Sequence, residues 1–328
     1  MIDVDSALLR GYKYIDLFCG IGGFRLALSS FGAECVFSSD IDRFACNTYE
    51  KNFHVKPDGD IEKIFTTKIP EHDILCAGFP CQPFSISGNK QGFDDKKGRG
   101  ELFLNIIRIA RAKKPKIIIL ENVKNLLFHN SGKTYASIKS ELEGLNYRVF
   151  ESVLCASDFG VPQARERLYI VAVKKKYRLC RFDFPQPLNS FHVLSDILLD
   201  ENEIGENFHI TRDYVLFDNL FDDINYKQLK RIGNIGDGRQ GERIYSIHGQ
   251  ATTLSSQGGG LGGKTGIYLV NNVIRILTPR ECARLMGFPD DYQLADTVPQ
   301  CYKQFGNSVV VDVIQYIVQA LINQIGEL

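Results

Sequence analysis

The residue with the clearest chemical potential is Cys81, within the segment Gly-Phe-Pro-Cys-Gln-Pro-Phe-Ser at 78–85. The preceding proline holds it rigidly, and the apolar run before the segment predicts a strand that ends there. A thiolate is a strong nucleophile, and basic segments downstream would lower the thiol pKa and favour that form. We therefore interpret Cys81 as a nucleophile, with a buried structural cysteine as the alternative.

Three charged residues follow at the ends of later strands. Glu121 ends the apolar run 116–120, which puts its carboxylate at the same edge of the predicted sheet as Cys81. Arg165 and Arg167 are two residues apart, so an extended backbone would place both on one face. A helix cap or salt bridge would also explain the glutamate, and two surface arginines would explain the pair. If neither alternative holds, Glu121, Arg165 and Arg167 form a catalytic set with Cys81.

A second group of residues suits a nucleoside. Residues 16–24 read Asp-Leu-Phe-Cys-Gly-Ile-Gly-Gly-Phe, a strand that leads into a glycine turn and a helix, and such glycines let the backbone approach a ligand. The dinucleotide pattern Gly-x-Gly-x-x-Gly does not occur here. Asp40 can accept hydrogen bonds from ribose hydroxyls, Ile41 can cover an adenine face, and Asp60 can reach the adenine amino group. The pattern indicates an adenosine-type ligand without a pyrophosphate, although a tight strand-to-helix turn would explain the glycines alone.

The first half of the chain alternates strand and helix patterns, which would bring these residues together. Repeated βαβ units predict a mostly parallel sheet with helices on both faces. The last two predicted strands enclose a non-helical, proline-containing segment, so we expect them to pair antiparallel at the sheet edge. The predicted strands cover residues 14–19, 34–39, 73–77, 116–121, 147–154 and 168–173, and the predicted helices cover 24–30, 42–52 and 102–112.

The chain divides after two prolines, at 185 and 187, where the alternation stops. We expect a catalytic and cofactor-binding domain at 1–188 and a smaller, mainly irregular or β domain at 189–274. The later part of the smaller domain is rich in glycine, serine and threonine. Interleaved arginine, tyrosine and leucine favour ordered loops that face a ligand over a flexible linker.

A C-terminal segment at 275–328 should return to the first domain. It starts with Thr-Pro-Arg-Glu at 278–281, which predicts a helix with a capping box and proline in its first turn. The apolar stretch 309–325 predicts a final amphipathic helix. Residues 304–308, Gln-Phe-Gly-Asn-Ser, would place amide and hydroxyl groups at the positive end of that helix, or act as a plain N-cap.

Composition excludes several classes of protein. The 328 residues are 44% hydrophobic and 24% charged, as in an ordinary globular protein. No apolar run approaches the ~18 residues of a membrane span, and the N-terminus has no secretory signal, so we expect a cytoplasmic protein. Nine cysteines without a Cys-x-x-Cys pair argue against a disulfide framework and a zinc site.

The net charge is zero, with 39 basic and 39 acidic residues, yet the charge is unevenly distributed. Residues 90–124, 163–181 and 227–284 each carry +6, whereas 189–226 carries −8. Solvated faces are the simple explanation. The alternative is a basic cleft lined by the three positive blocks and facing DNA phosphates, with the acidic block on the far side.

The order of these motifs resembles that of the cytosine-5 DNA methyltransferases over nearly the whole chain. Each motif alone is weak, but their shared order is specific. The motifs that carry the resemblance are Asp16–Gly23, Pro80-Cys81-Gln82, Glu121-Asn122-Val123, Gln163-x-Arg165-x-Arg167, Arg280–Arg284 and Gly306-Asn307.

The resemblance implies an S-adenosylmethionine-dependent α/β fold, Rossmann-like and mostly parallel, with an antiparallel edge hairpin and a small target-recognition domain. Cys81 would add to cytosine C6 while Glu121 hydrogen-bonds and protonates N3, so that C5 attacks the methyl group. Loss of the C5 proton then expels the thiolate. Arg165 would orient the base through O2, with Arg167 supporting the loop, and the base would be flipped out of the duplex.

The resemblance also implies binding residues. Gln240 would insert beside an orphan guanine and Arg243 would read guanine O6 and N7, unless both are loop or phosphate contacts. The residues expected to bind DNA are Ser85, Ser87, Gln240, Arg243 and Tyr245. The residues expected to hold the cofactor are Phe18, Gly20, Gly22, Gly23, Asp40, Ile41, Asp60, Pro80, Leu102, Asn307 and Ser308.

The expected partner is double-stranded DNA with a short specific site, in a bacterial restriction-modification system. We expect a monomer that needs no metal and pairs functionally with a restriction endonuclease without a stable complex. Three alternatives stay open. They are a tRNA cytosine-5 methyltransferase, a catalytically silent DNA-binding relative, and a Rossmann oxidoreductase, against which the missing dinucleotide pattern counts.

Overall fold

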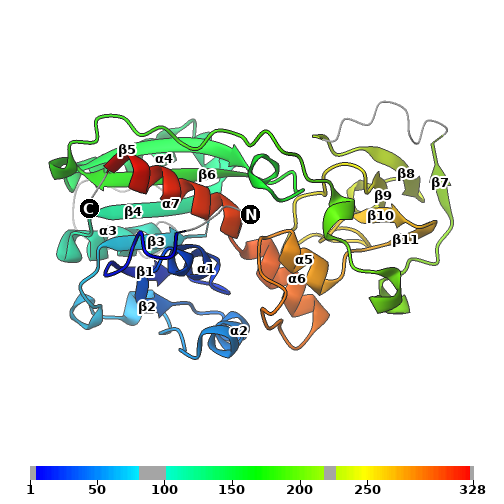
Figure 1. Cartoon of the computed structure of the whole chain (residues 1–328), viewed down its shortest axis with the longest axis horizontal. Coiled ribbons are helices and arrows are strands. Elements are labelled where there is room, and N and C mark those ends of the chain that lie inside the picture. The colour runs from blue at the N-terminus through cyan, green and yellow to red at the C-terminus, as the bar shows by residue number, and fades with distance from the viewer. Residues whose placement is uncertain (1–4, 81–100, 218–226, 326–328) are drawn as a thin grey trace.

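The computed structural model describes residues 5–80, 101–217 and 227–325. Its larger part, at the left of Figure 1, is a sheet accompanied by helices on both faces. The strands are β1 (Lys13–Leu17), β2 (Glu34–Ser39), β3 (Ile74–Gly78), β4 (Ile117–Val123), β5 (Tyr147–Cys155) and β6 (Glu166–Lys174). The helices are α1 (Gly23–Ser30), α2 (Arg43–Phe53), α3 (Glu101–Lys113) and α4 (Lys133–Gly144).

This sheet is mostly parallel, in the order β2-β1-β3-β4-β6-β5. Strands β1 to β4 pair in parallel, whereas β6 runs antiparallel to β4 and to the edge strand β5. The apolar run of β4 is buried on both faces, as a central parallel strand requires. The predicted fold class and its antiparallel edge are therefore confirmed.

Helix α4 was not expected from the sequence. Its buried positions are Thr134, Ile138 and Leu142, which share one helical face. One of the three is polar, and the rest of the helix carries charged and hydroxyl side chains, so the apolar signal is too sparse to predict it.

The strand register brings the functional motifs to one edge of the sheet. Gly78 at the end of β3 pairs with Glu121 on β4, and Tyr169 on β6 lies opposite that glutamate. Arg167 pairs with Val123, two residues further along. Because β6 runs antiparallel, its first residues meet the carboxyl ends of the parallel strands.

The second sheet, at the right of Figure 1, is smaller. Its order is β11-β10-β9-β8-β7, antiparallel except between β9 and β10. The buried isoleucines Ile232, Ile235, Ile244, Ile267 and Ile274 form its core. The strands are β7 (Tyr214–Leu216), β8 (Arg231–Ile235), β9 (Arg243–Ser246), β10 (Ile267–Val270) and β11 (Val273–Arg275).

The glycine-rich stretch of this sheet forms ordered loops. The amide of Gly262 donates a hydrogen bond to the carbonyl of Gly241, 2.9 Å away. A Cβ at Gly258 would lie 1.6 Å from the carbonyl oxygen of Gly263, so only glycine allows the two backbone segments to approach. The structure therefore favours ordered loops over a flexible linker, and their expected contact with a ligand stays a prediction.

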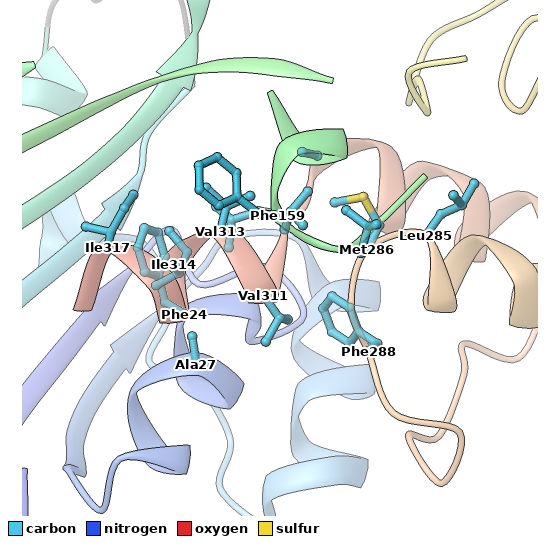
Figure 2. Packing of buried hydrophobic residues seen from close by; sticks show 14 of the residues in the cluster. Phe24, Ala27, Phe159, Leu285, Met286, Phe288, Val311, Val313, Ile314 and Ile317 are labelled. Atoms are coloured by element: carbon cyan, nitrogen blue, oxygen red, sulfur yellow. The ribbon is translucent and has the colours of Figure 1, made fainter. Parts of the chain in front are cut away.

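The C-terminal segment adds helices α5 (Pro279–Arg284), α6 (Val298–Asn307) and α7 (Val311–Ile325) between the two sheets and against the first (Figure 1). Figure 2 shows Ile314 and Ile317 of α7 beside Phe24 and Ala27 of α1, all almost fully buried. By length and composition Val298–Ile325 could cross a membrane, but 67% of its most apolar window is buried within the protein, as in a core helix.

One expectation about this segment is corrected. Residues 304–307 form the last turn of α6, and Ser308 is its C-cap, so the motif ends one helix and does not simply precede the next. Helix α6 is short and starts with a proline in its first turn, and its apolar residues are widely spaced. The motif therefore presents helix C-terminal carbonyls, which attract cations, at the site where the sequence indicated a positive helix end.

The predicted capping box at α5 is confirmed. The Thr278 hydroxyl accepts a hydrogen bond from the Glu281 amide at 3.3 Å, and the Glu281 carboxylate accepts one from the Thr278 amide at 2.8 Å. Glu281 is fully buried and also forms an ion pair with the buried Arg275 at 2.8 Å. This network fixes the start of α5 relative to β11.

The Thr278→Ala variant is expected to lose about 1 kcal/mol of unfolding free energy, because it removes an acceptor from a buried helix start. Urea denaturation followed by circular dichroism measures this loss. Thr297→Ala is the matched control, because Thr297 is the N-cap of α6 but its side chain makes no capping hydrogen bond. Equal losses in the two variants would contradict the capping role.

Candidate active site

A cavity of about 500 Å³ opens at the edge where the motifs meet. Its wall combines residues expected to hold an adenosine-type ligand with the charged groups at the ends of β4 and β6. The expected residues in the wall are Phe18, Gly20, Asp40, Ile41, Asp60, Pro80, Leu102, Glu121, Arg165, Arg167, Asn307 and Ser308. One cavity therefore joins the two groups of residues.

Gly22 and Gly23 do not belong to the wall. Gly22 has φ of 83° as the N-cap of α1, and a Cβ there would lie 2.3 Å from the Phe53 ring. A Cβ at Gly23 would lie 2.7 Å from Val309. Both glycines therefore allow the close packing of the start of α1 against Phe53 and Val309, and their expected role in holding the cofactor stays a prediction.

The part of the wall suited to a nucleoside is built around Asp40, in the loop between β2 and α2. Its carboxylate accepts hydrogen bonds from the amides of Gly20 and Asp42, both at 2.8 Å. Burial raises the pKa of Asp40, although these hydrogen bonds oppose the shift. The neighbouring Ile41 is 77% exposed at the cavity, so an apolar face is open to a flat ring.

The opposite part of the wall holds a buried ion pair. Arg167 Nε lies 3.2 Å from Glu121 Oε1, and both side chains are largely shielded from solvent. Burial raises the pKa of Glu121, although Arg167 and Arg165 oppose the shift. A carboxyl group with a raised pKa can hold a proton nearer to neutral pH and donate it.

Arg165 is held differently from Arg167. It is 2% exposed, and its guanidinium donates hydrogen bonds to the carbonyls of Leu254, Gly306 and Ser308 at 3.1, 3.1 and 2.8 Å. Burial and the nearby Arg167 lower its pKa to about 9, so it stays charged at neutral pH. Arg165 therefore ties the first sheet to both a loop of the second domain and the end of α6.

The candidate nucleophile Cys81 lies outside the described residues. The residues immediately before it are placed firmly, because Asn122 donates a hydrogen bond to the carbonyl of Phe79 at 2.9 Å. Pro80, the last described residue before the cysteine, lies in the cavity wall.

A comparison of the sequence with known protein families identifies the family to which the chain belongs. The family model described as C-5 cytosine-specific DNA methylase matches residues 12–323. The chain belongs to this family. It is a cytosine-5 DNA methyltransferase of the type II restriction-modification kind.

Curated relatives match the methyltransferase over almost its full length. Type II methyltransferase M.HhaI from Haemophilus parahaemolyticus is 49% identical over 317 residues, which are 97% of this chain and 96% of the relative. M.HaeII from Haemophilus aegyptius is 43% identical over 320 residues, or 97% of this chain and 95% of the relative.

Solved structures show the same fold. The methyltransferase EhMeth from Entamoeba histolytica has a TM-score of 0.73 at 22% identity and covers 96% of this chain and 99% of its own. A DNMT2 mutant from Spodoptera frugiperda has a TM-score of 0.71 at 23% identity, with 95% and 100% covered.

The expected DNA-contacting residues of the methyltransferase lie outside the cavity wall or outside the described residues. Ser85 and Ser87 lie outside the described residues. Gln240 is exposed at the start of a short turn between β8 and β9, and Arg243, half-buried, begins β9. Tyr245 is 6% exposed and its ring packs against Tyr268, and its expected contact with DNA stays a prediction.

The expected basic cleft of the methyltransferase is matched only in part by the described residues of its first two blocks, because Arg165 and Arg167 line the cavity but most of the lysines do not lie near it. Lys113 and Lys116 pair with Glu71 and Asp73 near the start of β4, at the edge opposite the cavity. The basic residues from Lys174 onward lie at that same far end of β6. Strand direction, which the charge count ignores, separates them from Arg165 and Arg167. The position of the acidic block relative to DNA stays a prediction.

Several residues in the methyltransferase cavity were not expected from the sequence. They are polar or aromatic, and they come from positions next to recognised motifs. Among the described residues, no group of three or more metal-binding side chains occurs, and the metal-free site stays a prediction. The polar and aromatic wall residues that were not expected include Ser39, Asp42, Glu62, Phe79, Asn122, Gln257 and Lys303.

Proposed function

We propose that this methyltransferase moves a methyl group from S-adenosylmethionine to C5 of a cytosine rotated out of duplex DNA. The observation that carries the proposal is the single cavity that joins Asp40 and Ile41 to the Glu121–Arg167 ion pair. A cofactor and a base held in the same cavity would lie within reach of each other.

The family uses S-adenosylmethionine, and the chemistry of the wall fits it. Asp40 and Asp60 supply carboxylates for the ribose hydroxyls and the adenine amino group, and exposed Ile41 supplies an apolar face for the ring. The cofactor, when bound, supplies an electrophilic methyl group. The further residues proposed to hold it are Phe18, Gly20, Pro80, Leu102, Asn307 and Ser308.

In the proposed reaction the Cys81 thiolate forms a bond to cytosine C6, and Glu121 gives a proton to N3. The resulting enamine carries electron density at C5, which forms a bond to the methyl group as the bond from that group to the cofactor sulfur breaks and S-adenosylhomocysteine is released. A base then removes the C5 proton, the bond to C6 breaks, and Cys81 and the N3 position return to their starting states. The raised pKa of Glu121 supports its role as the proton donor.

The geometry supports different roles for the two arginines. Arg167 borders Glu121 in the cavity, so we assign it to the base and to the charge that develops on it. The terminal nitrogens of Arg165 donate hydrogen bonds to three backbone carbonyls, so we assign this residue to positioning the cavity walls around the base.

Recognition of DNA is assigned to the domain at 189–274, with residues 275–328 completing the catalytic domain at 1–188. Exposed Gln240 and half-exposed Arg243 suit insertion into the duplex and guanine reading, respectively. We further propose a monomeric cytoplasmic enzyme, paired with a restriction endonuclease that it does not bind stably.

The test is transfer of labelled methyl groups from S-adenosylmethionine to duplex DNA and to tRNA, with bisulfite sequencing of the DNA. We expect label in duplex DNA at C5 of one cytosine of a short repeated site. Label in tRNA alone would favour the RNA-modifying branch of the family, and label on adenine would contradict the reaction.

A further inference from the structure

An ion pair joins the two sides of the cavity at the nucleoside end. Lys303 Nζ, from α6, lies 2.7 Å from Asp42 Oδ2, the N-cap of α2. Both residues belong to the cavity wall, and their side chains are 46% and 27% exposed, respectively. The pair therefore lies where the cavity meets solvent.

Asp42 uses its two carboxylate oxygens for different purposes. Oδ1 accepts the amides of Phe44 and Ala45 and so caps α2, which leaves Oδ2 for Lys303. The Asp42 amide in turn donates to Asp40, the proposed ribose acceptor. Partial burial opposes ionisation, but the hydrogen bonds from Lys303 and the amides prevail and lower the pKa of Asp42, so it is anionic at neutral pH.

Other contacts hold α2 against the loop that precedes α6, away from the cavity. Asn52 and Gln293 exchange hydrogen bonds at 2.9 and 2.7 Å, and Lys51 forms an ion pair with Asp296. None of these four residues belongs to the cavity wall. The packing of α2 therefore does not depend on Lys303 alone. The Asp42–Lys303 ion pair can act on the cavity without being needed to hold α2 in place.

We propose that the Asp42–Lys303 ion pair is a latch across the opening of the cofactor cavity that slows release of the bound nucleoside. It positions the loop that carries Asp40 and Ile41, and it spans the gap between α2 and α6 beside them. The inference rests on the proposed cofactor site. Lys303 is thus a positioning residue for cofactor residence, not a catalytic residue.

The experiment measures binding of S-adenosylhomocysteine by calorimetry, and its release by displacement of the tritiated compound with excess unlabelled compound, on the full chain without DNA. Lys303→Met and Asp42→Asn both remove the ion pair, and asparagine still caps α2. We expect release about two- to five-fold faster than in the unmodified protein, which is the range for a partly exposed pair. Lys303→Arg should retain slow release.

Lys51→Met is the matched control, because it breaks the ion pair between α2 and the loop that precedes α6, outside the cavity wall. Release from this variant should be unchanged, although its melting temperature should fall as much as that of Lys303→Met. Release from the unmodified protein should also accelerate with added salt, which screens an exposed pair, whereas release from Lys303→Met should not.

Unchanged release in Lys303→Met, or equal acceleration in Lys51→Met, would overturn the latch. Failure of the unmodified protein to bind S-adenosylhomocysteine would instead count against the proposed cofactor site itself. The two failures are therefore distinguishable.

Discussion

Duplex DNA with 5-fluorocytosine at the target position is expected to become covalently attached to the unmodified protein, and not to the Cys81→Ala variant. In the proposed reaction, loss of the C5 proton expels the thiolate. Fluorine cannot leave as a cation, so the bond between sulfur and C6 persists after methyl transfer. Denaturing gel electrophoresis with labelled DNA measures the adduct, and methyl transfer to ordinary DNA should vanish in the same variant.

Cys180→Ala is the control, because Cys180 is an exposed free cysteine away from the cavity wall. This variant should form the adduct at the normal rate. An adduct that survives Cys81→Ala would assign the nucleophile to a different residue, and loss of the adduct in both variants would show a general effect of cysteine removal.

The Glu121→Gln variant is expected to lower kcat by about 10²- to 10⁴-fold, the usual contribution of a positioned general acid. Glutamine has nearly the same shape but cannot deliver a proton to N3, and it leaves Arg167 without its anionic partner. Single-turnover methyl transfer measures the loss. Binding of S-adenosylhomocysteine should be unchanged, because the nucleoside wall is a different part of the cavity.

The pH dependence follows from the raised pKa of Glu121. The protonated carboxyl is the active form, so kcat should fall as pH rises through its pKa in the folded protein, and burial moves that fall to higher pH. This alkaline limb should disappear in Glu121→Gln. Glu166→Gln is the control, because Glu166 pairs with Lys124 on the surface, and its profile should match that of the unmodified protein.

The local sequence was sufficient to predict those elements that depend on interactions between residues close together in the chain. Apolar residues located β1 to β6 within about two residues, and the signal is clearest for β3 and β4, because central parallel strands buried on both faces are apolar over most of their length. The capping box at Thr278 was equally readable, since its atoms all lie within one turn. Helix α4 was not predicted because its buried face contains a threonine, and α6 was not predicted because it is short, with a proline in its first turn and widely spaced apolar residues.

The sequence by itself also determined the family and the chemistry, because the motif residues and their order specify which groups meet at the sheet edge. Only the tertiary structure distinguished the environments of Arg165 and Arg167. Arg165 contacts backbone carbonyls, whereas Arg167 forms an ion pair with Glu121. The tertiary structure also shows that Tyr245 is buried and that Lys303 lies beside Asp42. Most described lysines of the first two basic blocks lie at the sheet edge opposite the cavity. Those outcomes depend on strand direction and on contacts between distant segments, which neither residue spacing nor a charge count contains.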